Sequence, residues 1–294
     1  MAKRKGFRVL IATDGSAAAK AAVSTAVRFP WPEGVRAFGV IVKQVPAGYK
    51  RSALLTALNQ TAEIVAKGTM RALAQRWPDA QVQVVDASPV DGILREASRA
   101  RADVIVMGWR GHGAVRRLLA GSVSRGVVRR SPCAVLVVRR AVGDIQRIVV
   151  GFDASAHARR AVALIATLDP PRGGRVSLVS VVDMMQHVPS HPLVPSSLRA
   201  MLAGEVRRIN KDRIAQAREA LERPTTTLTA AGWKVDGSVT TGAPLRDLLA
   251  TVSDTRAQLL VVGARGVGGV EHLLLGSVAE GALHRSPVPV LIAR

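Results

Sequence analysis

The sequence has a single cysteine, few aromatic residues and no long apolar run. One cysteine, Cys133, cannot form an internal disulfide, which excludes the small secreted folds that depend on disulfides. Four Trp, four Phe and one Tyr are too few for a surface on which nucleic-acid bases stack. No apolar stretch approaches the roughly 18 residues of a membrane-spanning helix, and no signal-peptide core follows the basic first residues. We therefore expect a cytoplasmic protein with no membrane segment.

Positive charge and apolar residues are both abundant. Lys and Arg total 42 against 21 Asp and Glu, a formal net charge of +21, and 48% of the residues are hydrophobic. The apolar content is ample for buried cores and excludes a disordered chain. The charge favours polyanions such as nucleotides, nucleic acids or acidic lipids. The arginines are scattered, and the densest group spans only Arg125 to Arg130, which disfavours specific nucleic-acid binding.

The chain contains a tandem repeat. Residues 106–139 and 261–294 align without a gap, at an offset of 155, and 18 of 34 positions are identical. The segments that begin at Arg8 and Arg147 also match, but at an offset of 139, so the second copy has 16 extra residues. We expect this insertion between Asp183 and Gly232, where prolines indicate a loop. The repeat predicts two domains, at residues 6–141 and 144–294.

Each copy alternates between expected strands and helices. Short continuous apolar runs indicate strands buried on both faces, and amphipathic segments between them indicate helices. The expected strands span residues 8–13, 35–42, 81–87, 102–108 and 133–139 in the first copy, and 147–152, 175–182, 234–241, 257–263 and 288–294 in the second. This order predicts an α/β fold with two Rossmann-like domains, each an open five-stranded parallel sheet with helices on both faces.

A glycine-rich loop follows the fourth strand of each copy. The two loops share one spacing: Gly108, Gly111 and Gly121-Ser122 in the first, and Gly263, Gly266 and Gly276-Ser277 in the second. Glycine lets a backbone approach a phosphate closely, and the N–H groups at a helix start attract anions. Open α/β sheets bind ligands at the carboxyl ends of their strands, where these loops lie. The loops therefore predict a phosphate site in each copy.

This pattern, G-x2-G-x9-G-[S/T] after ADVIVMG with an Asp after the first strand, resembles the universal stress protein family. More narrowly, it resembles the nucleotide-binding members of that family in tandem-domain form, and it covers nearly the whole chain twice. The resemblance implies an adenine nucleotide alpha hydrolase-like fold and ATP, with Mg²⁺ as an open question, at the edge of each sheet. It also implies that the halves pair through their fifth strands as an internal pseudo-dimer. A homodimer and a separate protein partner stay open.

The resemblance implies a set of nucleotide-binding residues in each copy. In the family, the Asp after the first strand contacts the adenosine, and a Val that ends the second strand lines the adenine pocket. The implied set in the first copy is Ala12, Thr13, Asp14, Val40, Met107, Gly108, Gly111, Gly121, Ser122 and Val123. The implied set in the second copy is Gly151, Phe152, Asp153, Val181, Val262, Gly263, Gly266, Gly276, Ser277 and Val278.

The two copies differ at positions that matter for this interpretation. Phe152 replaces the smaller Thr13 and could crowd or stack on a base, and Gln258 replaces Asp103. In the loops, residues 116–117 are both Arg, whereas residues 271–272 are Glu and His. The first copy is therefore electrostatically better suited to a triphosphate.

Simpler structural roles stay open for several of these residues. Asp14 and Asp153 could cap the helices that follow them, a common role for Asp. Arg110 and Arg265, which share one loop position, could bind phosphate or form surface salt bridges. Trp109 could pack the loop.

Metal binding and nucleophilic catalysis are not expected. His187 and His191 lie near Asp183, but the intervening Val-Pro-Ser is not helical, which disfavours a paired metal site. Cys133 begins an expected buried strand and is best interpreted as a small hydrophobic residue.

The function that these observations favour is ATP binding in a stress response. No P-loop, dinucleotide fingerprint or nucleophile elbow is present, and neither copy offers a clear general base. We therefore expect a binder with slow or no ATP hydrolysis, at most a weak ATPase. Two alternatives are a stress-protein scaffold that binds no nucleotide and a basic protein that associates with nucleic acid.

Overall fold

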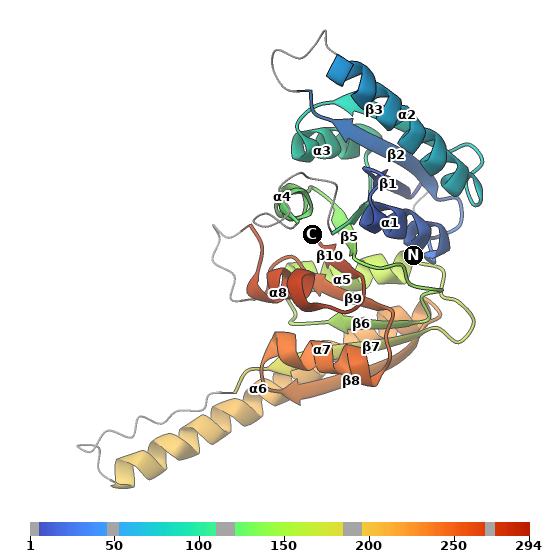
Figure 1. Ribbon diagram of the computed structural model, residues 1–294. Coiled ribbons are helices and arrows are strands. Elements are labelled where there is room, and N and C mark those ends of the chain that lie inside the picture. The colour runs from blue at the N-terminus through green and yellow to red at the C-terminus, as the bar shows by residue number, and fades with distance from the viewer. Residues whose placement is uncertain (1–5, 46–52, 110–120, 185–195, 268–273) are drawn as a thin grey trace.

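A computed structural model describes residues 6–45, 53–109, 121–184, 196–267 and 274–294 of the chain (Figure 1). Its strands form one sheet. They are β1 (Arg8–Ala12), β2 (Arg36–Lys43), β3 (Gln81–Asp86), β4 (Val104–Gly108), β5 (Ala134–Val138), β6 (Arg147–Gly151), β7 (Arg175–Val182), β8 (Lys234–Thr241), β9 (Leu259–Gly263) and β10 (Val290–Ala293).

The sheet is two parallel sheets joined edge to edge. Its strand order is β3-β2-β1-β4-β5-β10-β9-β6-β7-β8. All neighbours within each half run parallel, and only β5 and β10 run antiparallel, with Leu136 opposite Leu291. The predicted five-stranded parallel α/β sheets are confirmed, and they meet through their fifth strands, as expected. The pairing gives both fifth strands a neighbour on each side, so neither is left as an open edge.

Helices cover both faces of this sheet. They are α1 (Ala17–Arg28), α2 (Ala53–Ala74), α3 (Pro89–Ala100), α4 (Ser122–Arg130), α5 (Ala156–Thr167), α6 (Ser196–Ala230), α7 (Pro244–Asp254) and α8 (Ser277–Arg285). The buried side chains form two clusters, one on each face. One cluster includes residues of α1, α2, α5 and α6, and the other includes residues of α3, α4, α7 and α8.

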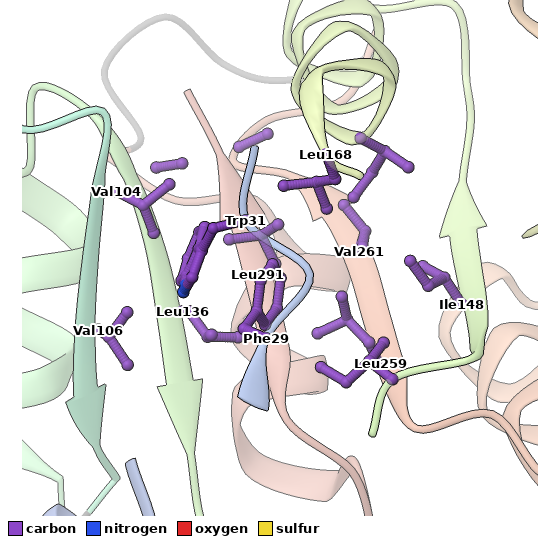
Figure 2. Close-up of a cluster of buried hydrophobic side chains, with 14 of the residues drawn as sticks. Phe29, Trp31, Val104, Val106, Leu136, Ile148, Leu168, Leu259, Val261 and Leu291 are labelled. Atoms are coloured by element: carbon purple, nitrogen blue, oxygen red, sulfur yellow. The ribbon is translucent and has the colours of Figure 1, made fainter. Parts of the chain in front are cut away.

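The first of these cores is continuous across the two halves. Figure 2 shows Phe29 and Trp31, from the first half, in one cluster with Leu168 and Leu291 from the second. The rings of Phe29 and Trp31 stack at 4.1 Å, and the indole N–H of Trp31 donates to the Ala26 carbonyl at 2.8 Å. This hydrogen bond allows the large indole to be buried without an unpaired donor.

The insertion in the second half is largely a helix. α6 has 35 residues, whereas its counterpart α2 has 22, and Figure 1 shows the first part of α6 extending beyond the sheet. The interval predicted for the insertion is correct, but much of it is helical, and residues 185–195, where the prolines predict a loop, lie outside the described residues. Buried Leu221 and Leu228 anchor the helix to either side of Pro224, which lacks the N–H of a regular helical residue. Among the described residues, no helix is long and apolar enough to cross a membrane.

Candidate functional site

Serines cap the helices that follow β1 and β6. The side-chain oxygens of Ser16 and Ser155 each accept the backbone N–H three residues later, at 3.2 and 3.1 Å. Asp14 and Asp153 lie two residues before the serines, are exposed, and each accept the serine N–H at 3.0 Å. The helix-cap alternative for the two aspartates is therefore wrong. Their carboxylates organise the turn at the carboxyl edge of the sheet.

In the second half, Asp153 also holds the glycine-rich loop. Its second carboxylate oxygen accepts the Val267 N–H at 3.1 Å, and the Ser155 hydroxyl donates to the Arg265 carbonyl at 3.1 Å. A Cβ placed on Gly266 would lie 2.5 Å from the same Asp153 oxygen, so a side chain there would displace the carboxylate from its present position. The Asp and the loop glycine, more than 100 residues apart in sequence, thus meet at one edge.

The first glycine of each loop is explained by packing. A Cβ on Gly108 would lie 2.7 Å from the backbone of Ala18, and one on Gly263 would lie 2.9 Å from the Cβ of His157. Both glycines let the first turn of α1 or α5 pack directly against the end of a strand. Neither position needs a ligand to account for glycine.

The third glycines differ between the halves. Gly121 has a φ of +84°, and a Cβ there would lie 3.0 Å from the Trp109 ring. Gly276 has a φ of −78° and a ψ of 159°, and the nearest neighbour of a Cβ would be the Ala264 carbonyl oxygen at 3.4 Å, an ordinary contact. The described residues therefore require glycine at 121 but not at 276.

Both loops lead into the start of a helix. α4 and α8 begin at Ser122 and Ser277, which are exposed, followed by the half-buried Val123 and Val278. The first N–H groups of a helix have no partner within it, and its N-terminus carries partial positive charge. Each helix start thus offers hydrogen-bond donors and an exposed hydroxyl to an anion.

The structure changes the predicted counterpart of Val40 in the second half. The carbonyl of Val40 accepts the Thr13 N–H at 3.0 Å, and in the second half the carbonyl of Val179 accepts the Phe152 N–H at 2.8 Å. The counterpart of Val40 is therefore Val179, two residues before the predicted Val181. The offset of 139 that aligns the first strands already leads from 40 to 179, so sequence reasoning had the signal needed to find it.

Several other predicted residues are buried. Phe152 is 4% exposed and belongs to the core cluster under α5, so its ring does not reach a base at the sheet edge, and that interpretation is wrong. Ala12, Val40, Met107 and Val262 pack in the core on the opposite face. These residues can shape the edge only through their backbones. Gly151 lies at the end of β6, against a side chain of α7.

Positive charge gathers beside the second loop. Burial lowers the pKa of His157, and the nearby guanidinium groups of Arg265, Arg160 and Arg294 lower it further, against the opposite effect of Asp153. Ala18 occupies the equivalent position in the first half. Arg160 and Arg294, which lie outside the loop, thus add to the positive charge that Arg265 supplies at the second site.

The densest basic segment is engaged in ion pairs. Arg125 and Arg129 of α4 lie 3.0 and 3.3 Å from the Glu280 carboxylate on α8, and Arg130 lies 2.7 Å from Asp91. These arginines therefore stabilise contacts between helices, which weakens the case for a nucleic-acid surface there.

Other predicted positions lie outside the described residues. They are Arg110, Gly111, Arg116, Arg117, His187, His191, Glu271 and His272. Within the described ranges, no group of three His, Cys, Asp or Glu residues could hold a metal ion. Burial raises the pKa of the Cys133 thiol, which agrees with its interpretation as a small hydrophobic residue.

The model of the universal stress protein family matches the chain twice, over residues 7–139 and 144–294. The chain belongs to the universal stress protein family. Universal stress protein Rv2005c of Mycobacterium tuberculosis is 29% identical over 233 residues, which cover 75% of this chain and 71% of the relative. A universal stress protein of Thermus aquaticus is 36% identical over 133 residues, 45% of this chain and 97% of the relative.

A solved universal stress protein of Archaeoglobus fulgidus has the same fold. Its TM-score to this chain is 0.67 at 21% identity, with 98% of this chain and 96% of that chain covered. The shared fold therefore extends over nearly the full length of both chains.

Proposed function

We propose that each half of this universal stress protein binds ATP at the carboxyl edge of its sheet. The observation that carries the proposal is Gly276. Among the described residues, backbone conformation and packing account for Gly108, Gly121 and Gly263, and the Asp153 carboxylate occupies the space beside Gly266, but none of these accounts for Gly276. A phosphate that approaches the start of α8 would account for it, because a side chain there would occupy the space of the phosphate.

The two helix starts supply the phosphate sites in this proposal. Ser122 and Ser277 offer hydroxyl donors, and the backbone N–H groups of Val123 and Val278 point along helix axes whose dipoles favour anions. Asp14 and Asp153 take the adenosine part, next to the carbonyls of Val40 and Val179. Mg²⁺ enters as the counter-ion of the nucleotide.

Nucleotide occupancy would change the second loop. Asp153 already accepts the Val267 N–H, so a nucleotide that takes this carboxylate replaces a loop contact by a ligand contact. The loop then has two arrangements, and a protein partner can distinguish them. We infer that the protein acts in the cytoplasm as a stress-response regulator that holds ATP with slow or no hydrolysis.

A pair of serine substitutions tests the two sites separately. Ser122→Asp and Ser277→Asp each place a carboxylate on a helix start, where it favours the helix but repels a triphosphate. Calorimetric titration with Mg-ATP at raised salt, which suppresses nonspecific attraction, should show two equivalents per wild-type chain and one per single variant. Gln216→Glu, an equal change of charge on exposed α6, should bind like wild type. The melting temperature of each variant should be no lower than that of wild type.

Two other outcomes would change the conclusion. If nucleotide-free wild-type protein shows no saturable binding, the scaffold alternative replaces the proposal. If binding falls steeply with salt and is the same in both aspartate variants, the protein associates with polyanions through its net charge.

A further inference from the structure

A groove runs between α1 and α2, on the face of the sheet opposite α4. Its volume is about 550 Å³, within the range of small-molecule sites. It begins at Thr13 and Gly15, next to the end of β1, and reaches Arg28 and Gln75 at the far ends of the two helices. Aliphatic side chains line it from both helices, among them Val23 and Val27 of α1 and Val65 of α2, and polar side chains lie between them. The helix starts proposed to bind phosphate lie on the other face.

Both ends of the groove are fixed by packing. At one end, Gly15 lies so close to Val65 that a Cβ on the glycine would be 2.7 Å from that side chain. At the other end, the Arg76 guanidinium donates to the carbonyls of Val27 and Phe29, at 2.9 Å for Val27, and ties the end of α2 to the end of α1. The separation of the helices is thus set without a ligand.

Gly68 keeps the middle of the groove open. It lies inside α2, where glycine costs about 1 kcal/mol relative to alanine. A Cβ there would meet no described atom within 4 Å, so neither the packing that the structure describes nor the backbone conformation requires glycine. The neighbouring Ile64 also lines the groove and is 72% exposed, a large apolar side chain with much of its surface uncovered. An apolar ligand body would account for both features.

The charge on the groove is positive. Lys20 and Arg28 both line it from α1, eight residues apart, which is about 12 Å along a helix axis. Among the described residues that line it, none is acidic. The second half does not repeat this pair. Arg159 occupies the position of Lys20 and donates a hydrogen bond to the Ala154 carbonyl, and Thr167 occupies the position of Arg28.

We propose that this groove, which we call the α1–α2 groove, binds an amphipathic anion of the long-chain carboxylate class. The aliphatic chain lies along the valines and over Gly68, where it covers Ile64, and the carboxylate pairs with Lys20 or Arg28. The ligand binds on one half only, and one end of its groove adjoins Asp14, the residue proposed to contact the adenosine.

Dodecanoate, kept below the concentration at which it self-associates, is the probe. Calorimetric titration of the full chain should show one saturable site, and the neutral 1,12-dodecanediol should bind much more weakly. Gly68→Leu should reduce the affinity for dodecanoate by about tenfold or more, because leucine fills the groove. The same substitution should not lower the melting temperature, since leucine is a better helix former than glycine.

A matched control comes from the second long helix. Gly204 of α6 also has open space around its Cβ position, so Gly204→Leu should leave dodecanoate affinity unchanged.

At least one of Lys20→Gln and Arg28→Gln should weaken binding. The proposal is overturned if wild type does not bind, if Gly68→Leu binds like wild type, if both charge variants do, or if the diol binds as tightly as dodecanoate. Ser122→Asp, which removes the proposed first nucleotide site, should not affect dodecanoate.

Discussion

The indole of Trp109 packs edge-on against the imidazole of His284, with ring centroids 5.0 Å apart and planes at 85°. Trp109 directly follows β4 of the first half, whereas His284 lies on α8 of the second, so the contact crosses the junction between the halves. Arg139 lies over the same indole at 4.8 Å and donates to the Leu283 carbonyl. Trp109 thus has a packing role, and its ring packs against the opposite half of the chain.

We expect Trp109→Ala to lower the free energy of unfolding by about 3–5 kcal/mol, the usual cost of removing a buried tryptophan. The side chain is 4% exposed, and its loss would leave a cavity at the junction. Urea unfolding followed by circular dichroism measures the change. Trp109→Phe retains an aromatic ring and should lose less. A loss below about 1 kcal/mol for the alanine variant would show that the junction does not depend on this ring.

Glu280 joins the halves electrostatically. Its carboxylate lies 3.0 Å from Arg125 and 3.3 Å from Arg129, and the side chain is only 24% exposed. We expect Glu280→Gln to destabilise the protein by about 1 kcal/mol, more at low salt than at high salt, because two arginines lose a shared counter-charge. Thermal unfolding at two salt concentrations measures this. Glu205→Gln, which removes an exposed pair within α6, is the control and should have no resolvable effect.

The inner strands could be predicted from sequence because most of them are continuous apolar runs buried on both faces, whereas the edge strands β3 and β8 are more exposed. The run at 133–139 became β5 (Ala134–Val138), and the run at 257–263 became β9 (Leu259–Gly263). Val181 shows the limit of such patterns. It and Val179 are both valines two residues apart on one strand, so they share a face, and alternation alone cannot choose between them.

Roles that depend on tertiary contacts could not be predicted. Gln258 stands in the second copy where the first has Asp103, and the sequence does not explain the exchange. In the structure, Asp103 accepts the N–H of Arg8 at 2.9 Å, and Gln258 accepts the N–H of Arg147 at 2.7 Å. A carboxylate and an amide oxygen serve equally well as acceptors for the first residue of a strand. The hydrogen bond from the Val267 N–H to Asp153 likewise could not be predicted from sequence.

The third glycines should respond differently to the same substitution. Gly121→Ala should destabilise the protein by about 1–2 kcal/mol, because alanine is strained at a φ of +84° and meets the Trp109 ring. Gly276→Ala should leave stability nearly unchanged, since its backbone is extended and the nearest contact is ordinary. Denaturant unfolding of the two variants side by side measures the difference. Equal losses would contradict the assignment of Gly276 as free of structural constraint.

His157 should make the stability of the second half depend on pH. Its pKa lies below the ordinary imidazole value of 6.5, because of burial first and then of Arg265, Arg160 and Arg294, while Asp153 opposes them. The folded protein therefore binds fewer protons at this position than the unfolded chain just below that value. The free energy of unfolding should rise with pH through this interval, and the contribution of His157 should be lost as the pH falls.

Unfolding measurements between about pH 5 and 7 test this, with His157→Gln as the variant that lacks the titrating group. The variant should show a shallower rise in stability with pH than wild type. Imidazole resonances of labelled protein give the midpoint directly, and a midpoint at or above 6.5 would contradict the effect of burial and of the three arginines. A triphosphate near α8 would place negative charge near His157 and favour its protonated form. Added Mg-ATP should therefore raise the midpoint of the His157 titration in wild type. It should do so far less in Ser277→Asp, where the proposed phosphate site is blocked.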